Sequence, residues 1–273
     1  MQLRASLILL LPLAILGGCK TLEVQESMFI RSDAVIKAKP LPEQVFANSS
    51  KLELQRPDGV QLNGVLVTRE GAERTLLYFG GNLFRMDADG KQILSSLERC
   101  KVNVAMFDYR GYGRSKGKPT VAILKEDAVA IYDMLEARTP GKVAVHGQSL
   151  GSFVAAGVAQ QRPVRSVVLE TPGASLMEIV HNQVPWYYKP FTTIKFAPEL
   201  TVVDQVATVR QIKSPLLVMV GERDDLTPAY MGRQVFEAAS QPAKQLFVLP
   251  EAGHNNVLSN PSTAATLCPF IEA

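Results

Sequence analysis

The chain has 273 residues, of which 47% are hydrophobic and 20% are charged, and its formal net charge is +3. This composition is typical of a globular protein with one sizeable core. So small a net charge, without a clustered basic helix, gives no basis for a nucleic-acid partner. There is no internal repeat and no low-complexity tract, so a single α/β domain can account for the length.

The first 18 residues have the pattern of an export signal. Arg4 carries their one positive charge, and residues 5–18 form an apolar run too short for a membrane span of about 20 residues. The run ends in Leu16-Gly17-Gly18-Cys19, which resembles the lipobox of bacterial lipoproteins. The resemblance implies cleavage before Cys19, lipidation of that cysteine and a membrane anchor. A plain signal peptide followed by a chance cysteine is the alternative.

Lys20, which follows the cysteine, favours the outer membrane by resemblance to Gram-negative lipoproteins, with the protein facing the periplasm. Residues 19–50 hold scattered prolines and little periodicity. We interpret them as a lipidated tether and an N-terminal strap lying on a domain of residues 51–273.

Within residues 51–273, apolar runs and helical spacing predict strands that alternate with helices. Strands are predicted at residues 51–55, 60–68, 75–79, 102–107, 143–145, 164–169, 215–220 and 245–249. Helices are predicted at residues 87–100, 121–138, 201–212, 229–239 and 261–271, and a further one begins at the end of the 143–151 stretch. This alternation predicts a doubly wound, mostly parallel sheet, whose functional site lies at the carboxyl ends of the strands.

Residues 173–200 interrupt the alternation with three prolines and a cluster of aromatic residues. The aromatic residues are Trp186, Tyr187, Tyr188, Phe191 and Phe196. We interpret this insertion as a short, irregular or partly helical cap over the sheet edge. Its aromatic side chains could form an apolar wall for an acyl group, or they could simply pack the cap onto the domain.

The stretch V-A-V-H-G-Q-S-L-G at residues 143–151 contains the pattern G-x-S-x-G. Its position between a predicted strand and a predicted helix is that of a nucleophile elbow, a sharp turn that exposes a serine at the end of a strand. Gly147 and Gly151 leave room for the strand and the helix to approach each other. We therefore predict that Ser149 is a nucleophile, with a helix N-terminus beneath it that favours developing negative charge.

A serine nucleophile requires a base, and the chain has three histidines. His146 lies inside the elbow strand and is expected to pack as a structural residue. His181 lies in the insertion, where it could line a pocket. His254 follows the last predicted strand, at the same sheet edge as Ser149, and is the expected general base.

The acid that orients the base should lie between Ser149 and His254 in the sequence. Asp224 and Asp225 follow the strand predicted at residues 215–220, and Glu170 ends an earlier strand. Adjacent side chains of an extended loop point in different directions, so only one of the two aspartates can face His254. Position alone leaves this choice open.

Two backbone N–H groups are needed to hold the oxyanion of an acyl-transfer reaction. The residue after the nucleophile, Leu150, supplies the first. The second is expected from Gly80-Gly81-Asn82-Leu83, which follows the strand predicted at residues 75–79, with Asn82 as the donor.

From about residue 51 to its end, the chain resembles the α/β-hydrolases, and in particular the serine hydrolases with three further motifs. The first, H-G-N, stands here as Gly80-Gly81-Asn82, with glycine in place of histidine. The second, D-Y-R-G-Y-G-x-S, stands at residues 108–115, where we interpret its glycines as serving turns and Asp108 and Arg110 as fixing the loop by hydrogen bonds. The third, G-x-x-D-x-x-x-P, begins at Gly221 and favours Asp224 over Asp225.

The resemblance implies hydrolysis of a carboxylic ester or thioester through an acyl-enzyme on Ser149, with a small-molecule or lipid acyl ester as substrate. A serine peptidase and an acyltransferase are alternatives on the same triad, and a non-catalytic, lipid-anchored binding protein is another. We expect no cofactor and no metal, because no cluster of histidines and cysteines is present.

Two cysteines remain besides Cys19. Cys100 and Cys268 could pair in an exported protein. The sequence does not supply the distance that a disulfide requires, so two buried free thiols remain the alternative.

Overall fold

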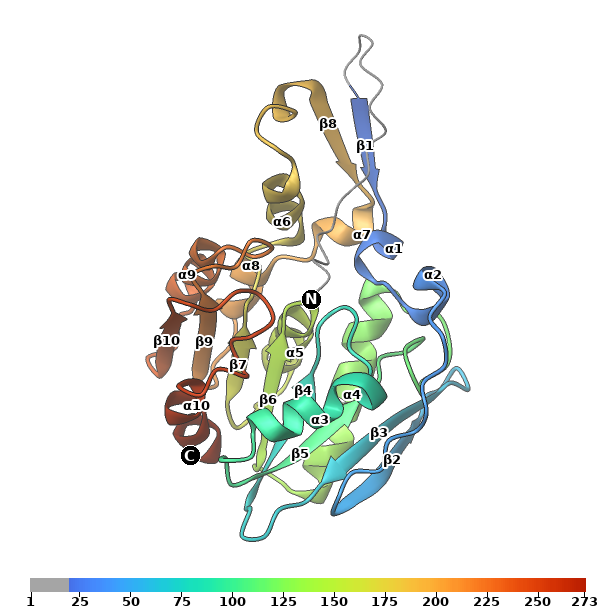
Figure 1. The fold of residues 1–273 in the computed structure, drawn as a ribbon, viewed down its shortest axis with the longest axis vertical. Helices are drawn as coiled ribbons and strands as arrows, with labels where there is room; N and C mark the ends of the chain where they lie inside the picture. The colour runs from blue at the N-terminus through green and yellow to red at the C-terminus, as the bar shows by residue number, and fades with distance from the viewer. Residues whose placement is uncertain (1–19) are drawn as a thin grey trace.

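The computed structural model describes residues 20–273, so the predicted signal peptide and Cys19 lie outside the described residues. At its centre is an eight-stranded sheet with the order β10-β9-β7-β6-β4-β5-β3-β2 (Figure 1). The strands are β2 (Ser49–Gln55), β3 (Gln61–Val67), β4 (Arg74–Phe79), β5 (Val102–Phe107), β6 (Val143–Gln148), β7 (Val167–Glu170), β9 (Leu216–Gly221) and β10 (Lys244–Leu249). Strands β4, β5, β6, β7, β9 and β10 run parallel to one another, and β3 runs antiparallel to both β2 and β5. The doubly wound, mostly parallel α/β fold is confirmed.

Helices cover both faces of this sheet. They are α3 (Met86–Ser96), α4 (Val121–Arg138), α5 (Leu150–Gln161), α8 (Gln205–Val209), α9 (Ala229–Ala238) and α10 (Thr263–Glu272). Successive residues of a strand point to opposite faces. Along β4, Leu77 and Phe79 therefore join the core beneath α4, α5 and α9, whereas Leu76 and Tyr78 join the core beneath α3 and α10. The central strands are continuous apolar runs because both of their faces are covered.

Local signals place two of the helix starts. Thr120 caps α4, since its hydroxyl oxygen accepts a hydrogen bond of 3.2 Å from Ile123 N. The helix predicted at residues 201–212 is shorter in the structure. Asp204 caps it, accepting a 2.8 Å hydrogen bond from Ala207 N, so α8 begins only at Gln205. The preceding turn forms a separate short helix, α7 (Pro198–Thr201).

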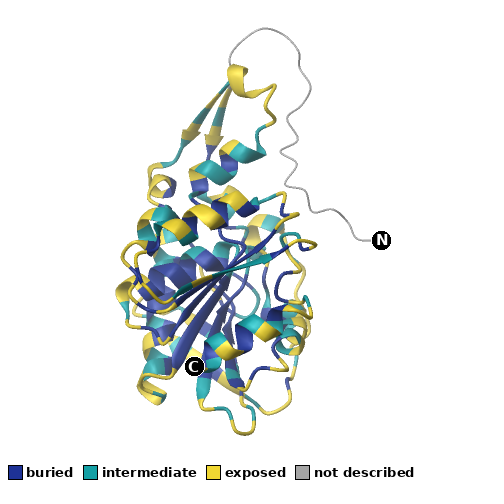
Figure 2. Cartoon of the chain, turned by 90° about the vertical axis from the view of Figure 1, so that its left-hand side faces the viewer, coloured by how far each residue is buried: buried dark blue, intermediate teal, exposed yellow. Residues whose placement is uncertain are grey.

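The insertion contains a strand that its composition did not indicate. The insertion comprises α6 (Leu176–Gln183), a 3-10 turn at Lys189–Phe191, β8 (Thr192–Phe196), which is this strand, and α7. β8 pairs in parallel with β1 (Lys20–Val24), from Lys20 opposite Thr192 to Val24 opposite Phe196. The first residues of the predicted tether are therefore one of the two strands of the cap, and Figures 1 and 2 show this pair projecting from the body of the molecule.

The rest of the N-terminal segment crosses the domain on its way to β2. It includes the short helices α1 (Glu26–Phe29) and α2 (Asp33–Ile36). Glu26 Oε1 accepts a 2.8 Å hydrogen bond from Val121 N, at the start of α4. Among residues 20–273, no helix combines the length and the apolar composition that crossing a bilayer requires.

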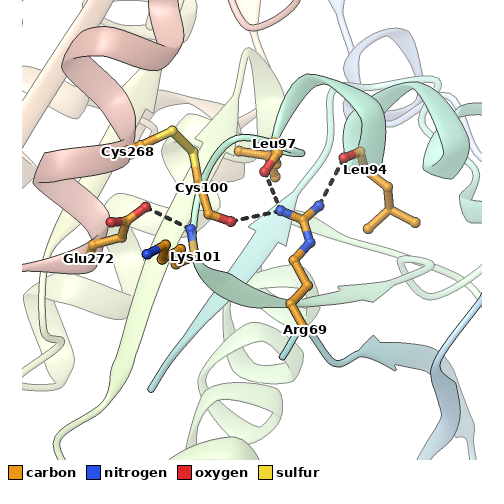
Figure 3. The surroundings of a disulfide bond; sticks show 7 residues. All are labelled: Arg69, Leu94, Leu97, Cys100, Lys101, Cys268 and Glu272. Atoms are coloured by element: carbon orange, nitrogen blue, oxygen red, sulfur yellow. Dashed lines mark hydrogen bonds between the residues drawn. A yellow bond between two sulfur atoms is a disulfide. The ribbon is translucent and has the colours of Figure 1, made fainter. Parts of the chain in front are cut away.

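Cys100 and Cys268 are joined by a disulfide, which links the end of the α3 region to α10 (Figure 3). Both residues are buried. Beside the disulfide, Lys101 N donates a 2.7 Å hydrogen bond to Glu272 Oε1, and the Arg69 guanidinium donates to the carbonyl oxygens of Leu94 and Cys100 at 2.9 Å each. The cation therefore lies against carbonyl groups at the C-terminal end of α3, where a positive charge is favourable.

Candidate active site

The turn between β6 and α5 holds Ser149 in a strained conformation, with φ 53° and ψ −114°. Gly147 and Gly151, on either side of the serine, are required because there is no room for a Cβ atom at either position. A Cβ atom on Gly147 would lie 1.9 Å from the Gly151 carbonyl oxygen, and one on Gly151 would lie 2.0 Å from the Phe79 carbonyl oxygen. Any side chain at these two positions would thus push the helix away from the strands. The strain is of the kind that functional sites hold in place through their surroundings.

Ser149, His254 and Asp224 come from three separate segments and meet at the carboxyl edge of the sheet. Ser149 Oγ lies 2.8 Å from His254 Nε2, and His254 Nδ1 lies 2.8 Å from Asp224 Oδ2. The Asp224 side chain is 1% exposed and that of His254 is 13% exposed. With the Nδ1 proton directed at the carboxylate, Nε2 is left to accept the serine proton.

The loop after β9 holds the Asp224 carboxylate from both sides. Its Oδ1 accepts hydrogen bonds from Leu226 N at 2.9 Å and Thr227 N at 2.8 Å. Its Oδ2 lies 2.8 Å from the Thr227 hydroxyl, which is also 3.1 Å from His254 Nδ1. Asp225 is exposed. Of the two aspartates, Asp224 is the one that faces the imidazole, and Thr227 is a neighbour of this contact that the motif did not indicate.

The other two histidines lie away from the serine hydroxyl. His146 is fully buried, and its Nε2 lies 2.9 Å from Glu170 Oε2. The second oxygen of Glu170 accepts a 2.8 Å hydrogen bond from Leu258 N, just beyond the His254 loop. Glu170 therefore contacts His146 rather than His254. His181 is an exposed residue of α6, with its ring 6.0 Å from that of Phe196.

Three residues brace the loop that carries Asn82. Asn82 Oδ1 accepts hydrogen bonds from Arg31 N at 2.9 Å and from the Tyr112 hydroxyl at 3.1 Å. The Tyr109 hydroxyl donates to the Gly80 carbonyl oxygen at 2.8 Å. The side chain of Asn82 thus fixes the loop, while its backbone N–H is left for another acceptor. Within residues 20–273, neither Asn82 N–H nor Leu150 N–H donates to another group.

The segment at residues 108–115 therefore does more than form turns. Asp108 accepts from Met86 N at 2.7 Å and from Arg114 N at 2.8 Å. Burial raises the pKa of its carboxyl group to about 6, against the lowering effect of these two hydrogen bonds. Arg110 makes the expected fixing contacts, with Asp127 oxygens at 2.8 and 3.0 Å. The two tyrosines of D-Y-R-G-Y-G-x-S were the available signal for the bracing of the Asn82 loop.

Within the described part of the chain, one group of three His, Cys, Asp or Glu side chains is close enough to hold a metal ion. Its members are Cys100, Cys268 and Glu272, and the two sulfur atoms are bonded to each other. This group lies at the disulfide and not among the residues around Ser149.

Comparison with known proteins finds a matching family model and several relatives. A model of the family described as serine aminopeptidase, S33 matches residues 90–205. The uncharacterized protein Rv2307c of Mycobacterium tuberculosis is 31% identical over 226 residues, which cover 80% of this chain and 78% of that protein. The lysophosphatidylserine lipase ABHD12 of Xenopus tropicalis is 29% identical over 192 residues, covering 63% of this chain and 48% of that protein.

Solved structures share the fold. The Pyrococcus furiosus esterase Pf2001 superposes with a TM-score of 0.66 at 21% identity, covering 85% of this chain and 98% of the esterase. Together with the sheet order, this likeness shows that the chain has the α/β-hydrolase fold, and the long match to the mycobacterial protein shows that the chain belongs to one family with it.

Proposed function

We propose that this protein is a serine hydrolase that cleaves a carboxylic ester or thioester through an acyl-enzyme on Ser149. One observation carries the proposal: the unbroken series of 2.8 Å contacts from Ser149 Oγ through His254 to the buried Asp224 carboxylate. A histidine placed in this way can take the serine proton as the oxygen attacks a carbonyl carbon.

In the first half of the reaction, His254 Nε2 takes the proton from Ser149 Oγ as the new C–O bond forms. Asp224 stabilises the resulting imidazolium through Nδ1–H. The Leu150 and Asn82 N–H groups donate to the oxyanion of the tetrahedral intermediate. His254 then returns its proton to the leaving alcohol or thiol, and the acyl group remains on Ser149.

In the second half, a water molecule attacks the acyl-enzyme with His254 again as base, which releases the carboxylic acid and restores Ser149. Ser149 and the His254 ring are partly exposed, which supports entry of water and substrate from this sheet edge. An alcohol in place of water would make the same triad an acyltransferase.

Labelling with a fluorophosphonate probe tests the nucleophile directly. We expect the wild-type chain and Ser259→Ala, a matched change of an exposed serine that follows His254 in the sequence, to label and to hydrolyse p-nitrophenyl esters. Ser149→Ala should do neither. A series of ester chain lengths then measures the size of the acyl site. Absence of labelling in the folded wild-type protein would contradict the proposal and favour a non-catalytic binding role.

A serine peptidase is the second candidate, because the matching family model is described as a serine aminopeptidase. The same triad is compatible with an amide substrate. Comparing an aminoacyl p-nitroanilide with the corresponding ester separates the two. A higher kcat/KM for the anilide would favour the peptidase.

We further propose that Cys19 is lipidated and anchors the protein to the outer membrane, facing the periplasm. The apolar run that ends at Cys19 supports this, and so does the Cys100–Cys268 disulfide, because disulfides persist in exported proteins. Metabolic labelling with an alkyne fatty acid should mark the wild-type chain and not Cys19→Ser. Equal labelling of both would reject Cys19 as the site.

A further inference from the structure

The turn at the tip of the cap presents an unusual group of exposed aromatic side chains. Trp186 is 81% exposed, Tyr187 54%, Tyr188 43% and Phe191 63%. Within the described residues, Tyr230 is the one other aromatic residue of comparable exposure. Four aromatic residues within a stretch of six, all facing solvent, are not explained by packing of the cap, whose small core is formed by other residues.

The turn is held in shape by hydrogen bonds of its own. Tyr188 N donates to the Pro185 carbonyl oxygen and Phe191 N to that of Tyr188, both at 2.9 Å. The Thr192 hydroxyl donates to the Tyr188 carbonyl oxygen, also at 2.9 Å. These hydrogen bonds fix the backbone of the turn, which lies at the end of the molecule where the β1–β8 pair projects (Figures 1 and 2).

Three of these rings also contact one another. The centroids of Trp186 and Tyr187 are 5.8 Å apart, and those of Tyr187 and Tyr188 are 4.7 Å apart. Trp and Tyr have an apolar body and a polar edge, and they concentrate where a bilayer meets water. Their position together at one projecting tip is therefore suited to the interface between a bilayer and water.

The charge of the tip is complementary to an anionic surface. Residues 21–24 and 184–197 carry two lysines, Lys189 and Lys195, against a single acidic residue, Glu23. Glu23 lies opposite Lys195 in the strand pair, whereas Lys189 lies within the aromatic turn, outside that pair. Basic residues beside exposed aromatic residues favour membranes that contain anionic lipids.

The path of the chain brings its first described residue to the same place. β1 and β8 run in parallel with Lys20 opposite Thr192, so the first described residue lies directly beside the aromatic turn. Lys20 follows Cys19 in the sequence, and an acyl chain on that cysteine would emerge at the tip.

We propose that the turn at residues 185–191 is a membrane-docking surface that inserts its aromatic rings into the headgroup region of an anionic phospholipid bilayer. The insertion begins after β7, at the carboxyl edge of the sheet where Ser149 lies, and the bridge between Ser175 and Asp204 brings its end back to its beginning. Docking by the tip turns this edge, and with it the serine, toward the lipid surface. The docking role does not depend on hydrolase activity.

Trp186 is the one tryptophan of the chain, so intrinsic tryptophan fluorescence reports on the tip alone. The full chain is compared with and without vesicles of phosphatidylethanolamine and phosphatidylglycerol, in both the wild-type and the Cys19→Ser forms. In both forms we expect a blue shift of the emission, protection from acrylamide, and quenching by lipids brominated on their acyl chains. Unchanged acrylamide access together with absent bromolipid quenching would overturn the proposal, even for protein that remains bound to the vesicles.

Variants that retain Trp186 as the fluorescent reporter test which residues of the turn bind the membrane. Tyr187→Ser with Phe191→Ser should reduce the vesicle affinity measured through Trp186 at least tenfold, and Lys189→Glu should reduce it at least fivefold on anionic vesicles. The matched control is Val45→Ser, which removes an apolar side chain that is 85% exposed outside the cap. An equal loss in the control, or a shift of Trp186 emission that follows protein concentration without vesicles, would point to a contact with a second copy and reject the membrane.

The tip variants should retain full hydrolysis of a soluble short-chain ester, which shows that they are folded. If the Trp186 side chain enters the bilayer but the protein has no esterase activity, the proposed reaction is rejected and the docking surface is retained. The reverse result, esterase activity with Trp186 remaining in water, would reject the docking surface alone.

Discussion

Glutamine in place of Glu170 should weaken folding while sparing catalysis. Glu170 accepts from His146 Nε2 at 2.9 Å and from Leu258 N at 2.8 Å, and its side chain is 2% exposed. His146 Nδ1 is buried without a hydrogen-bond partner among residues 20–273, so we assign the ring proton to Nε2. The carboxylate thus satisfies two buried donors.

A glutamine amide cannot satisfy both donors. If its oxygen accepts from Leu258 N, its NH₂ group faces His146 Nε2, and the ring proton must move to Nδ1, where it finds no acceptor. The opposite amide orientation leaves Leu258 N–H unpaired instead. In either orientation one buried N–H group is left without an acceptor. The free energy of unfolding should therefore fall by about 1–3 kcal/mol. Glu170→Ala removes both acceptors and should cost roughly twice as much.

Urea unfolding followed by circular dichroism measures the stability, and ester turnover per fluorophosphonate-titrated site measures the chemistry. We expect Glu170→Gln to keep kcat within a few-fold of wild type, because Glu170 does not contact His254. Asp224→Asn, in contrast, should lower kcat on the order of ten-thousandfold at nearly unchanged stability. A loss of turnover in Glu170→Gln as large as that in Asp224→Asn, with an unchanged unfolding midpoint, would show that Glu170 is the orienting acid and would refute this reasoning.

Other contacts lead to further expected outcomes. Thr227→Val keeps the shape of the side chain but removes a hydroxyl 2.8 Å from Asp224 Oδ2, so kcat on the ester substrate should fall about 10- to 100-fold, as for a hydrogen bond to a charged group, with KM unchanged. Replacing both Cys100 and Cys268 by serine opens a loop with a sequence separation of 168 and should lower the free energy of unfolding by about 5 kcal/mol, measured by urea unfolding; a change below about 1 kcal/mol would contradict the loop-closure argument. Burial raises the pKa of the Asp108 carboxyl group from 3.8 to about 6, so the folded chain holds this proton more tightly than the unfolded chain. The stability that this group contributes is fully present below about pH 4 and is lost as the pH rises through about 6. Asp108→Asn should therefore show a weaker fall of unfolding free energy over this range than wild type, and parallel pH profiles would exclude the assignment.

Features that depend on a few neighbouring residues were predictable from the sequence. The G-x-S-x-G turn needs only five residues, and the two glycines occupy positions where a Cβ atom would collide with backbone. Thr120 caps α4 through a contact three residues away, and α4 has the predicted bounds. Because parallel strands end at one edge of a sheet, correct strand assignments were enough to bring Ser149 and His254 to the same edge.

The choice between Asp224 and Asp225 depended on loop geometry. Position left it open, and only the resemblance to a family motif favoured Asp224. In the structure, the loop turns back so that Leu226 and Thr227 donate their N–H groups to Asp224, which directs its other oxygen at His254. An aspartate followed two and three residues later by available N–H groups is a known turn signal, so part of this preference was present locally.

The alternation of strands and helices, the elbow and the placement of the serine and histidine at one edge were determined by the sequence alone, because periodicity and turn chemistry act over short stretches. Only the tertiary structure decided that residues 20–24 form a strand of the cap, that Cys100 meets Cys268, and that Tyr109 and Tyr112 brace the Asn82 loop. Each of these contacts joins segments that are far apart in the chain. Their pairing depends on the path that the packed core imposes, and no local pattern of residues encodes that path.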